Sequence, residues 1–584
     1  MPAIIRNWRI SAIGAVLLLA FLVRLPGIPY GLPYHVFGDE EANVYGALKM
    51  IELKTVLPVL HQSEFNKLLY YPPLLAYTYA VLFMPILLLK YLSAGMSFAD
   101  AKSLLTLDPS VLWYIVRTLN VLFALSNIYL TYRIGLSFFR NKTVSWMAAL
   151  FLATSFIDAT VSNAIHHWTP GIFCSLLSLY LVLRAFEGNN LHTKKRLIVW
   201  AGITIGCSFS ISYLVFFMPF ILLRICYREG ILQFTSSAPY VVFNFSLIQR
   251  TLGSLIRFCI PFTIIAVCII AVHPGPLFTQ IINHTTPEDG AHRTIISFIR
   301  YYSSVMWRME TPLVIFGIIG FLAMFKKQKE VLLTFMVFFV TAGILTYAFL
   351  FNIARYLLPI LPFISLVAGY GLYRVVEMIS MSRIRTTGLT LLIILLCVYV
   401  VSLFGRYTIL SFRNDTRVIA KNWIEAHIPA RSSVILNSEW MRLLGTSSST
   451  IIQSRISPGS LRAADRIMLS NDRYAAHPFT LASLFFTSSQ EKKMLINTTI
   501  EQATSSVFLI YDSWINTPEY MTNLASQGTR MSSWIGGSTA LKQISLPIGG
   551  ERGQASMHII EQLYRTDYFG PDVYIYVLNS PHTL

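Results

Sequence analysis

The amino-acid sequence predicts a mostly α-helical protein that crosses a membrane many times, followed by a small α/β domain. Hydrophobic residues make up 54% of the chain and charged residues only 13%, whereas soluble domains carry about 25% charged residues. Apolar runs close to the roughly 20 residues that span a bilayer as a helix recur as far as residue 405, and polar residues dominate after it. We therefore expect a membrane module over 1–405 and a soluble domain over 406–584.

The candidate membrane helices are apolar segments separated by short connectors. They cover residues 9–27, 74–92, 111–135, 145–163, 168–186, 197–210, 212–227, 254–272, 311–325, 331–351, 355–373 and 387–405. The first segment follows Arg6 and Arg9, but no small-residue cleavage site follows it. We therefore expect a retained membrane helix rather than a signal peptide.

Basic connectors predict the direction of each crossing, because Lys and Arg gather on the cytoplasmic side of membrane proteins. Arg6 and Arg9 place the N-terminus inside and the loop after the first helix outside. The basic connector 140–142 should be inside, so only one of the segments 74–92 and 111–135 can cross. Segment 74–92 follows two prolines and contains Pro85, and proline interrupts helices. We predict that 74–92 is a re-entrant or juxtamembrane hairpin.

With that choice the chain crosses the membrane about eleven times. The outer loops are 28–73 and 273–310, and the turn at 165–168 also faces outward. We expect a multi-pass protein of the bacterial inner (plasma) membrane, with a cytoplasmic N-terminus and an extracytoplasmic C-terminal domain. The net charge of +18 is explained by basic inner connectors, and the sequence contains no motif typical of nucleic-acid binding.

The C-terminal domain should contain at least one helix and three strands. Asp415 and Thr416 form an N-cap signal that is followed by an amphipathic turn, and Pro429 ends the helical pattern. Short runs rich in β-branched and aromatic residues predict the strands. They cover residues 433–436, 507–511 and 573–578.

Three consecutive acids, Asp39, Glu40 and Glu41, follow the first apolar helix. One interpretation is a solvated loop start in which Asp39 caps the next helix. The other is that Asp39 acts as a general base at the boundary of water and membrane, where it takes a proton from an acceptor hydroxyl. The residues alone leave both interpretations open.

A series of short motifs, spread over about 400 residues, resembles the GT-C glycosyltransferases, especially the protein O-mannosyltransferase and lipid A aminoarabinose transferase branch. The motifs are Arg24, Asp39-Glu40, Tyr71-Pro72-Pro73, Arg117, Arg355-Tyr356-Leu357-Leu358-Pro359 and the segment from Arg417 through Trp423-Ile424 to Ile428-Pro429. The resemblance implies a sugar donor carried on a polyprenyl phosphate. It also implies transfer with inversion to a protein, lipid or glycan acceptor at the outer face, with Asp39 as catalytic base and Glu40 as its neighbour.

Several residues are candidates for binding the substrate or its phosphate, because arginine recognises phosphate in a planar, bidentate manner. Arg355 is the strongest, since it lies at the outer end of a predicted crossing, and a snorkelling interfacial anchor is its alternative. Arg117 and Arg293 are further candidates. His166 and His167 occupy the turn where relatives carry an arginine and an acid.

Asp158 lies within an apolar run, eight residues before that turn. A carboxylate at the centre of a membrane helix costs about 2.5–3.5 kcal/mol, so we expect Asp158 to face the protein interior or to lie near the outer end. It could replace the missing acid or pair with His166.

The sequence indicates no certain cofactor but leaves a divalent metal ion open, because histidines and carboxylates are common metal ligands. The candidate ligands are Glu40, His284 and His292, and their spacing matches no tight metal motif. A solvated polar loop is the alternative interpretation of 273–310.

Two other classes of function compete with a glycosyltransferase. A lipid or solute transporter, including a flippase, would need polar residues spread through the midplane of the helix bundle. A non-catalytic envelope assembly component would use the C-terminal domain for docking and would tolerate changes at Asp39 and Arg355. Polar residues concentrate in the outer loops instead, which favours an enzyme at the outer interface.

Overall fold

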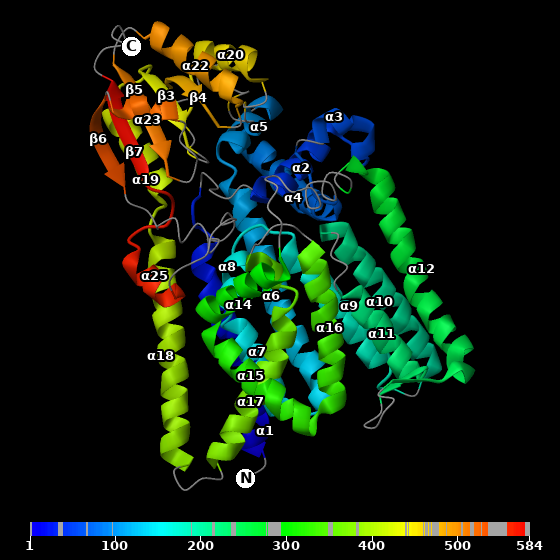
Figure 1. Cartoon of the computed structure of the whole chain (residues 1–584). Coiled ribbons are helices and arrows are strands. Elements are labelled where there is room, and N and C mark those ends of the chain that lie inside the picture. Colours follow the sequence, from blue (N-terminus) through cyan, green and yellow to red (C-terminus); the bar gives the residue numbers. More distant parts are fainter. Residues whose placement is uncertain are drawn as a thin grey trace. The chain divides into compact units, whose positions relative to one another are not determined.

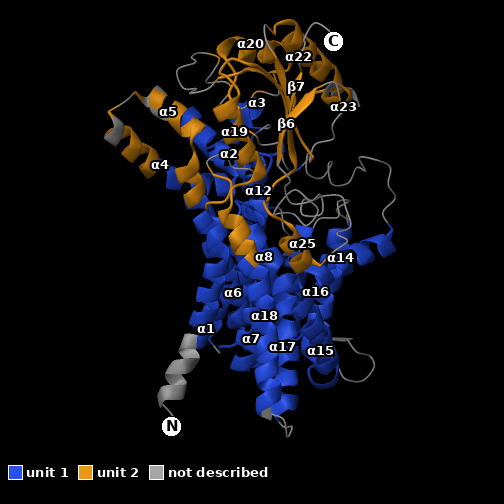
Figure 2. Ribbon diagram, turned by 90° about the vertical axis from the view of Figure 1, so that its left-hand side faces the viewer, with its two compact units in different colours: residues 1–28, 39–84, 115–405 blue, residues 29–38, 85–114, 406–584 orange. Residues whose placement is uncertain are grey.

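The structure is a computed structural model of the chain. It describes residues 3–32, 39–65, 68–95, 97–188, 190–212, 217–234, 241–275, 277, 294–348, 354–380, 385–438, 441, 443–458, 461, 465, 469, 478–485, 487–503, 506–513, 519–526, 528–534 and 558–578. The chain divides into two compact units (Figure 2). Unit 1 contains residues 1–28, 39–84 and 115–405, and unit 2 contains residues 29–38, 85–114 and 406–584.

Most of the described residues up to 412 lie in helices (Figure 1). The long ones are α1 (Ala3–Arg24), α2 (Asp39–Leu53), α4 (Leu74–Ala94), α6 (Ser110–Phe139), α7 (Lys142–Ala153), α9 (Trp168–Ala185), α10 (Leu191–Ser212), α11 (Met218–Glu229), α12 (Ile248–Val272), α14 (Ile295–Met309), α15 (Thr311–Lys327), α16 (Lys329–Ala348), α17 (Leu361–Ser380) and α18 (Arg385–Phe412). A short helix, α8 (Phe156–Ser162), lies between α7 and α9.

Glycines allow neighbouring helices of unit 1 to pack with their backbones in contact. Helix α15 packs on α17, and a Cβ atom on Gly320 would lie only 2.0 Å from the carbonyl oxygen of Val367. Helix α10 packs on both α9 and α12, and a Cβ atom on Gly202 would lie 2.2 Å from the carbonyl oxygen of Phe258. Small residues at such crossings are typical of helix pairs in membranes.

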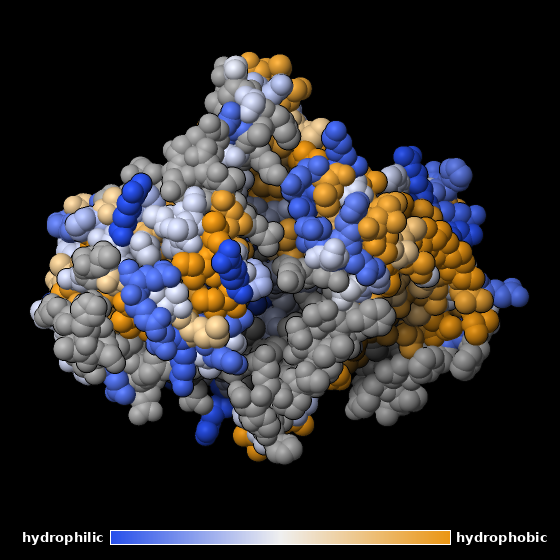
Figure 3. Space-filling view, turned by 90° about the horizontal axis from the view of Figure 1, so that it is seen from above, coloured by the Kyte–Doolittle hydropathy of each residue, from blue (hydrophilic) through white to orange (hydrophobic). Residues whose placement is uncertain are grey.

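Seven helices in the described residues are long and apolar enough to cross a membrane, and the number rises to nine if each of two bent helix pairs is one span. Their outer surfaces are apolar. Exposed side chains on α12 include Leu252, Ile256, Ile260, Ile264 and Val267, and Figure 3 shows a broad hydrophobic surface on the right of that view. The chain is therefore a multi-pass membrane protein, and the number of eleven crossings stays a prediction.

Three expectations about the helices need correction. Residues 74–94 form one continuous helix, α4, and not a hairpin, because Pro85 removes one hydrogen bond of the ladder without reversing the chain. The apolar segment 145–163 is two helices, α7 and α8, bent by 58°. The expected outer loop 273–310 contains a helix, α14, which meets α15 at a bend of 112°.

Unit 2 contains a five-stranded mixed sheet in the order β4-β3-β5-β7-β6. The strands are β3 (Ser433–Asn437), β4 (Thr480–Ser483), β5 (Val507–Asp512), β6 (Thr529–Trp534) and β7 (Val573–Leu578). Strand β3 is parallel to β4 and β5, whereas β7 is antiparallel to β5 and β6. The predicted small α/β domain is confirmed, including its three predicted strands, and its place on the outer face stays a prediction.

Helices cover both faces of this sheet. Helix α19 (Thr416–His427) packs its Ala420 and Ile424 on Val434, Leu436 and Ile510. On the opposite face, α22 (Ser489–Glu501) contributes Leu495 and Ile496 to a second apolar core. The predicted N-cap of α19 is present, since the Asp415 side chain accepts a hydrogen bond from the Arg417 backbone N–H.

Candidate active site

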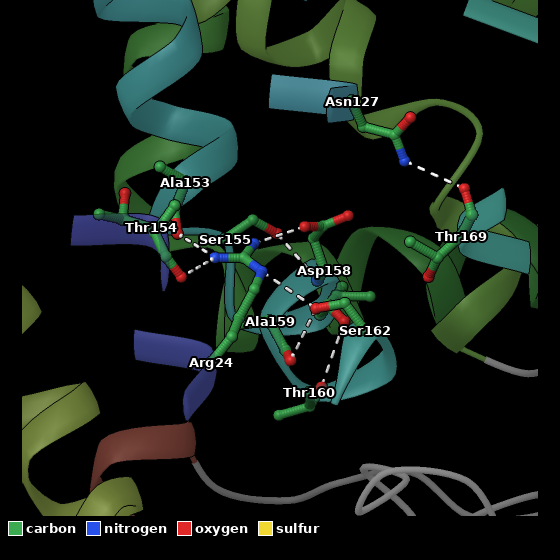
Figure 4. Close-up of polar contacts among 12 residues, drawn as sticks. Arg24, Asn127, Ala153, Thr154, Ser155, Asp158, Ala159, Thr160, Ser162 and Thr169 are labelled. Carbon is green, nitrogen blue, oxygen red and sulfur yellow. Dashed lines mark hydrogen bonds and ion pairs between the residues drawn. The ribbon is translucent and has the colours of Figure 1, made fainter. Parts of the chain in front are cut away.

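The short helix α8 and the turn that follows it, residues 163–167, are the centre of a buried polar network in unit 1. Arg24, the last residue of α1, is fully buried, and its Nη2 lies 2.5 Å from Asp158 Oδ2. The same guanidinium donates to Ser162 Oγ and to the carbonyl oxygen of Ala153, both at 3.0 Å (Figure 4). One arginine therefore ties α1 to the end of α7 and to both ends of α8.

The start of α8 is held by a second carboxylate from far along the chain. Glu310, between α14 and α15, accepts hydrogen bonds at Oε1 from the Ser155 hydroxyl at 2.7 Å and from the Ile157 backbone N–H at 2.8 Å. All three groups are buried. A buried helix start needs such acceptors, because its first N–H groups have no partner within the helix. Glu310 thereby satisfies one of these N–H groups and the Ser155 hydroxyl.

Glu40 and Arg117 form a bidentate ion pair between α2 and α6. Arg117 Nε lies 2.9 Å from Glu40 Oε1, and Arg117 Nη2 lies 2.7 Å from Glu40 Oε2. Both side chains are fully buried. Glu40 Oε1 also accepts a hydrogen bond from the Ile165 backbone N–H at 2.8 Å, and Arg117 Nη1 donates to the carbonyl oxygen of Ile28. Glu40 therefore connects the start of α2 to the turn after α8.

Asp39 is the first residue of α2. Its side chain lies outside the described part of the structure, so its role as a cap or as a base stays a prediction. The first turn of α2 is held by the next residue, Glu40, which accepts hydrogen bonds from Arg117 and from the Ile165 N–H. A helix N-terminus also carries a partial positive charge that favours a carboxylate in this turn.

The turn after α8 collects residues from distant predicted motifs. The Tyr71 ring lies 4.0 Å from the His167 ring, centroid to centroid, and the Tyr356 ring lies 5.3 Å from the Trp168 ring. His166 and His167 are both buried beside each other. The turn expected at these histidines is present, and it brings the Tyr71 motif and the Arg355 motif to one place.

Arg355 is buried in a single 3-10 turn, Ala354–Leu357, that packs against α8 and α14. It thus lies near the same turn as Glu40 and the two histidines, through its neighbour Tyr356. The contacts of Arg117 with Glu40 and Ile28 use all three of its guanidinium nitrogens. The proposed phosphate-binding roles of both arginines stay predictions.

The sequence singled out Arg24 and Asp158 but did not predict that they pair with each other. Two further members of this network, Asn120 and Glu310, were not predicted. Asn120 donates from Nδ2 to the carbonyl oxygens of Ser162 and Ala164, and nothing in the run that contains it marks that role. The sequence gives only a weak indication of the role of Glu310, which is its position directly before Thr311 and Pro312 at the start of an apolar run.

No group of three or more His, Cys, Asp or Glu side chains that could hold a metal ion occurs in the described ranges. Of the candidate ligands, Glu40 is bound to Arg117, and His284 and His292 lie outside the described residues, as does Arg293. The metal ion stays an open prediction.

The comparisons with known proteins concern the fold. No family profile and no curated protein matches the sequence. Among solved structures, the chain shows a distant similarity to an archaeal oligosaccharyltransferase and to ArnT.

The similarities are low in sequence identity and cover most of this chain. AglB from Archaeoglobus fulgidus, in complex with an inhibitory peptide and a dolichol-phosphate, is 12% identical with a TM-score of 0.46 over 88% of this chain and 70% of AglB. ArnT from Cupriavidus metallidurans in the apo state is 11% identical with a TM-score of 0.46 over 90% of this chain and 96% of ArnT. ArnT bound to undecaprenyl phosphate is 11% identical with a TM-score of 0.41, over 98% of both chains. The roles of individual residues rest on the contacts of this chain.

Proposed function

We propose that the chain is an inverting glycosyltransferase that moves a sugar from a polyprenyl phosphate to an acceptor hydroxyl at the outer membrane face. The single observation that carries the proposal is the anchoring of Glu40. Glu40, the second residue of α2, is held by Arg117 and by the Ile165 N–H, which supports a place for Asp39, the residue before it, near the turn that contains His166 and His167. Rigid placement of this kind is what a catalytic base requires.

The proposed reaction uses Asp39 as general base. The acceptor hydroxyl oxygen attacks the anomeric carbon of the donor sugar, and its proton passes to the Asp39 carboxylate. The bond between the anomeric carbon and the phosphate oxygen breaks, and its electron pair leaves with the polyprenyl phosphate. A base on the face of the sugar opposite the leaving group gives inversion at the anomeric carbon.

The leaving phosphate needs stabilisation of its charge more than it needs a proton. We assign that role to Arg355, because it is buried beside the turn after α8 rather than exposed at a helix end. Arg117 is better suited to position Glu40, since its donors already contact Glu40 and Ile28. Glu40 is then a positioning residue, and Asp39 is the catalytic one.

The test uses the full-length protein in proteoliposomes. Labelled undecaprenyl phosphates that carry mannose, glucose or aminoarabinose are supplied one at a time, together with crude envelope material as a source of acceptors. We expect label to pass to the acceptor with wild type and to fall at least a hundredfold with Asp39→Asn, which has the same shape, because general bases contribute about 10²–10⁴-fold.

Glu41→Gln is the matched control, because it removes an adjacent acid from the same helical turn. It should retain transfer. Full activity of a normally inserted Asp39→Asn variant contradicts the proposal, and so does movement of the labelled lipid across the bilayer without covalent transfer. Repeating the assay with a chelator shows whether a divalent ion takes part.

A further inference from the structure

Asn43 is a buried amide that no group in the described residues satisfies. Its side chain is 1% exposed, and neither its amide nitrogen nor its amide oxygen has a hydrogen-bond partner there. Buried polar groups are nearly always paired, and each unpaired one costs about 1–3 kcal/mol. An asparagine whose two amide atoms both lack a partner therefore needs an explanation.

The position of Asn43 in α2 relates it to the proposed catalytic base. Residues 39 and 43 are four positions apart in one helix, so they share a face, and they are separated by about 6 Å along the helix axis. Glu40, three positions before Asn43, is the anchor to Arg117. Asn43 therefore lies one turn further along the same side of the helix as the acidic pair.

The same side of α2 leads to the turn after α8. A methyl group on Gly46, three positions after Asn43, would lie 2.9 Å from Leu69 Cδ1, so this side packs on Leu69. Two residues later, the Tyr71 ring lies against the His167 ring. Asn43 is therefore bordered by the acidic pair at one end and by the segment that holds Tyr71 at the other.

We propose that Asn43 binds hydroxyl groups of the donor sugar. This inference rests on the proposed function. An amide offers both a donor and an acceptor, whereas a phosphate only accepts hydrogen bonds and an isoprenoid chain forms none. Of the three parts of a polyprenyl-phosphate sugar, only the sugar satisfies both atoms of Asn43.

A structural role and a substrate-binding role of Asn43 make opposite predictions for Asn43→Leu, which replaces the amide by an apolar group of similar shape. If the amide is paired only with substrate, the ligand-free variant melts at the same temperature as wild type or higher, because an unpaired buried amide has been removed. Asn120→Leu is the matched control. Asn120 is equally buried but donates to two carbonyl groups, so its replacement should lower the melting temperature.

The second measurement compares ligands with and without a sugar. Stabilisation of the detergent-solubilised full-length protein is titrated with undecaprenyl phosphate and with undecaprenyl phosphates that carry mannose, glucose or aminoarabinose. For wild type, at least one sugar-bearing lipid should bind more tightly than undecaprenyl phosphate. Asn43→Leu should weaken binding of that lipid about tenfold, the equivalent of one to two neutral hydrogen bonds, and leave the affinity for undecaprenyl phosphate unchanged.

Two results overturn the inference while the proposed function stands. One is a lower melting temperature of ligand-free Asn43→Leu. The other is an equal preference for sugar-bearing lipid in wild type and variant, in a protein whose transfer activity still requires Asp39. If none of these lipids binds to wild type, the proposed function fails first, and the inference fails with it.

Discussion

Glu40 and Arg117 are 77 residues apart in the chain and form a bidentate ion pair in which neither side chain is exposed to solvent. The pair joins α2 to α6, and Glu40 continues the link to the Ile165 N–H in the turn after α8. A buried pair of this kind is costly to desolvate and is weak evidence for stability by itself. Its value here is geometric, because it holds the start of α2 against the turn that contains His166 and His167.

Removal of the charge of Glu40 should destabilise the protein strongly. Glu40→Gln keeps the shape but removes the carboxylate that pairs with the buried Arg117, and breaking a buried ion pair costs about 3–5 kcal/mol. Thermal unfolding in detergent is the measurement. Glu64→Gln is the matched control, since Glu64 pairs with Lys49 at 3.1 Å on the surface and exposed pairs contribute only about 0–1 kcal/mol. Equal effects of the two substitutions would contradict the prediction.

Glu310 should be replaceable by glutamine but not by alanine. Glutamine keeps a carbonyl oxygen that can accept from the Ser155 hydroxyl and the Ile157 N–H, whereas alanine leaves both donors buried without an acceptor. Each buried donor that is left without an acceptor costs about 1–3 kcal/mol. We expect Glu310→Ala to lower the melting temperature and to impair transfer by loosening α8, and Glu310→Gln to retain most of both. A Glu310→Gln variant as damaged as Glu310→Ala would show that the charge, and not the acceptor, matters.

The apolar helices and three strands could be predicted because their signals are local. Long hydrophobic runs indicated α6, α9 and α12, and β-branched or aromatic runs indicated β5 and β7. Two strands of the five-stranded sheet were missed because their sequences carry no such signal: β4 reads Thr-Leu-Ala-Ser, and β6 is mostly polar. Their pairing depends on β3 and β7, which are distant in the chain.

The candidate site was only partly predictable, because its residues have local signals but their partners are distant in the chain. Asp39, Glu40, Arg117 and the two histidines stand out as polar residues beside apolar runs. The partners of these residues depend on how each helix is rotated, and no local pattern encodes that rotation. The break between α7 and α8 could not be predicted, because Thr154 and Ser155 are too few to end the apolar run that contains them. The start of α8 is stabilised instead by Glu310, which lies 155 residues after Ser155 in the chain.

Close packing of α15 on α17 predicts a strong effect of a single methyl group. A Cβ atom on Gly320 would lie 2.0 Å from the Val367 carbonyl oxygen, which is backbone and cannot rotate away. Gly320→Ala should therefore cost at least the upper part of the usual range for overpacking, about 1–3 kcal/mol. Gly343→Ala in α16 is the control, because nothing lies within 4 Å of its added Cβ. It should stabilise the protein by up to about 1 kcal/mol, and a loss of stability there would contradict the argument.

The last prediction concerns the pH dependence of unit 2. His558 is the N-cap of α25 (Ile559–Arg565), and its Nδ1 accepts a hydrogen bond from the Ile560 N–H at 3.3 Å. Burial lowers the pKa of His558, although nearby Glu561 acts in the opposite direction. Because the folded pKa lies below the unfolded value of about 6.5, the unfolded chain takes up the proton first. The stability that depends on His558 is therefore complete above about pH 6.5 and decreases as the pH falls toward the folded pKa.

The measurement for this prediction is thermal unfolding of the full-length protein between pH 8 and pH 5, for wild type and His558→Asn. Asparagine is a good N-cap that does not titrate, so the variant should lose less stability than wild type as the pH falls. The two profiles should converge at high pH, where the neutral imidazole still caps the helix. A steeper loss in His558→Asn, or parallel profiles across the whole range, would show that protonation of this histidine does not limit the stability of unit 2.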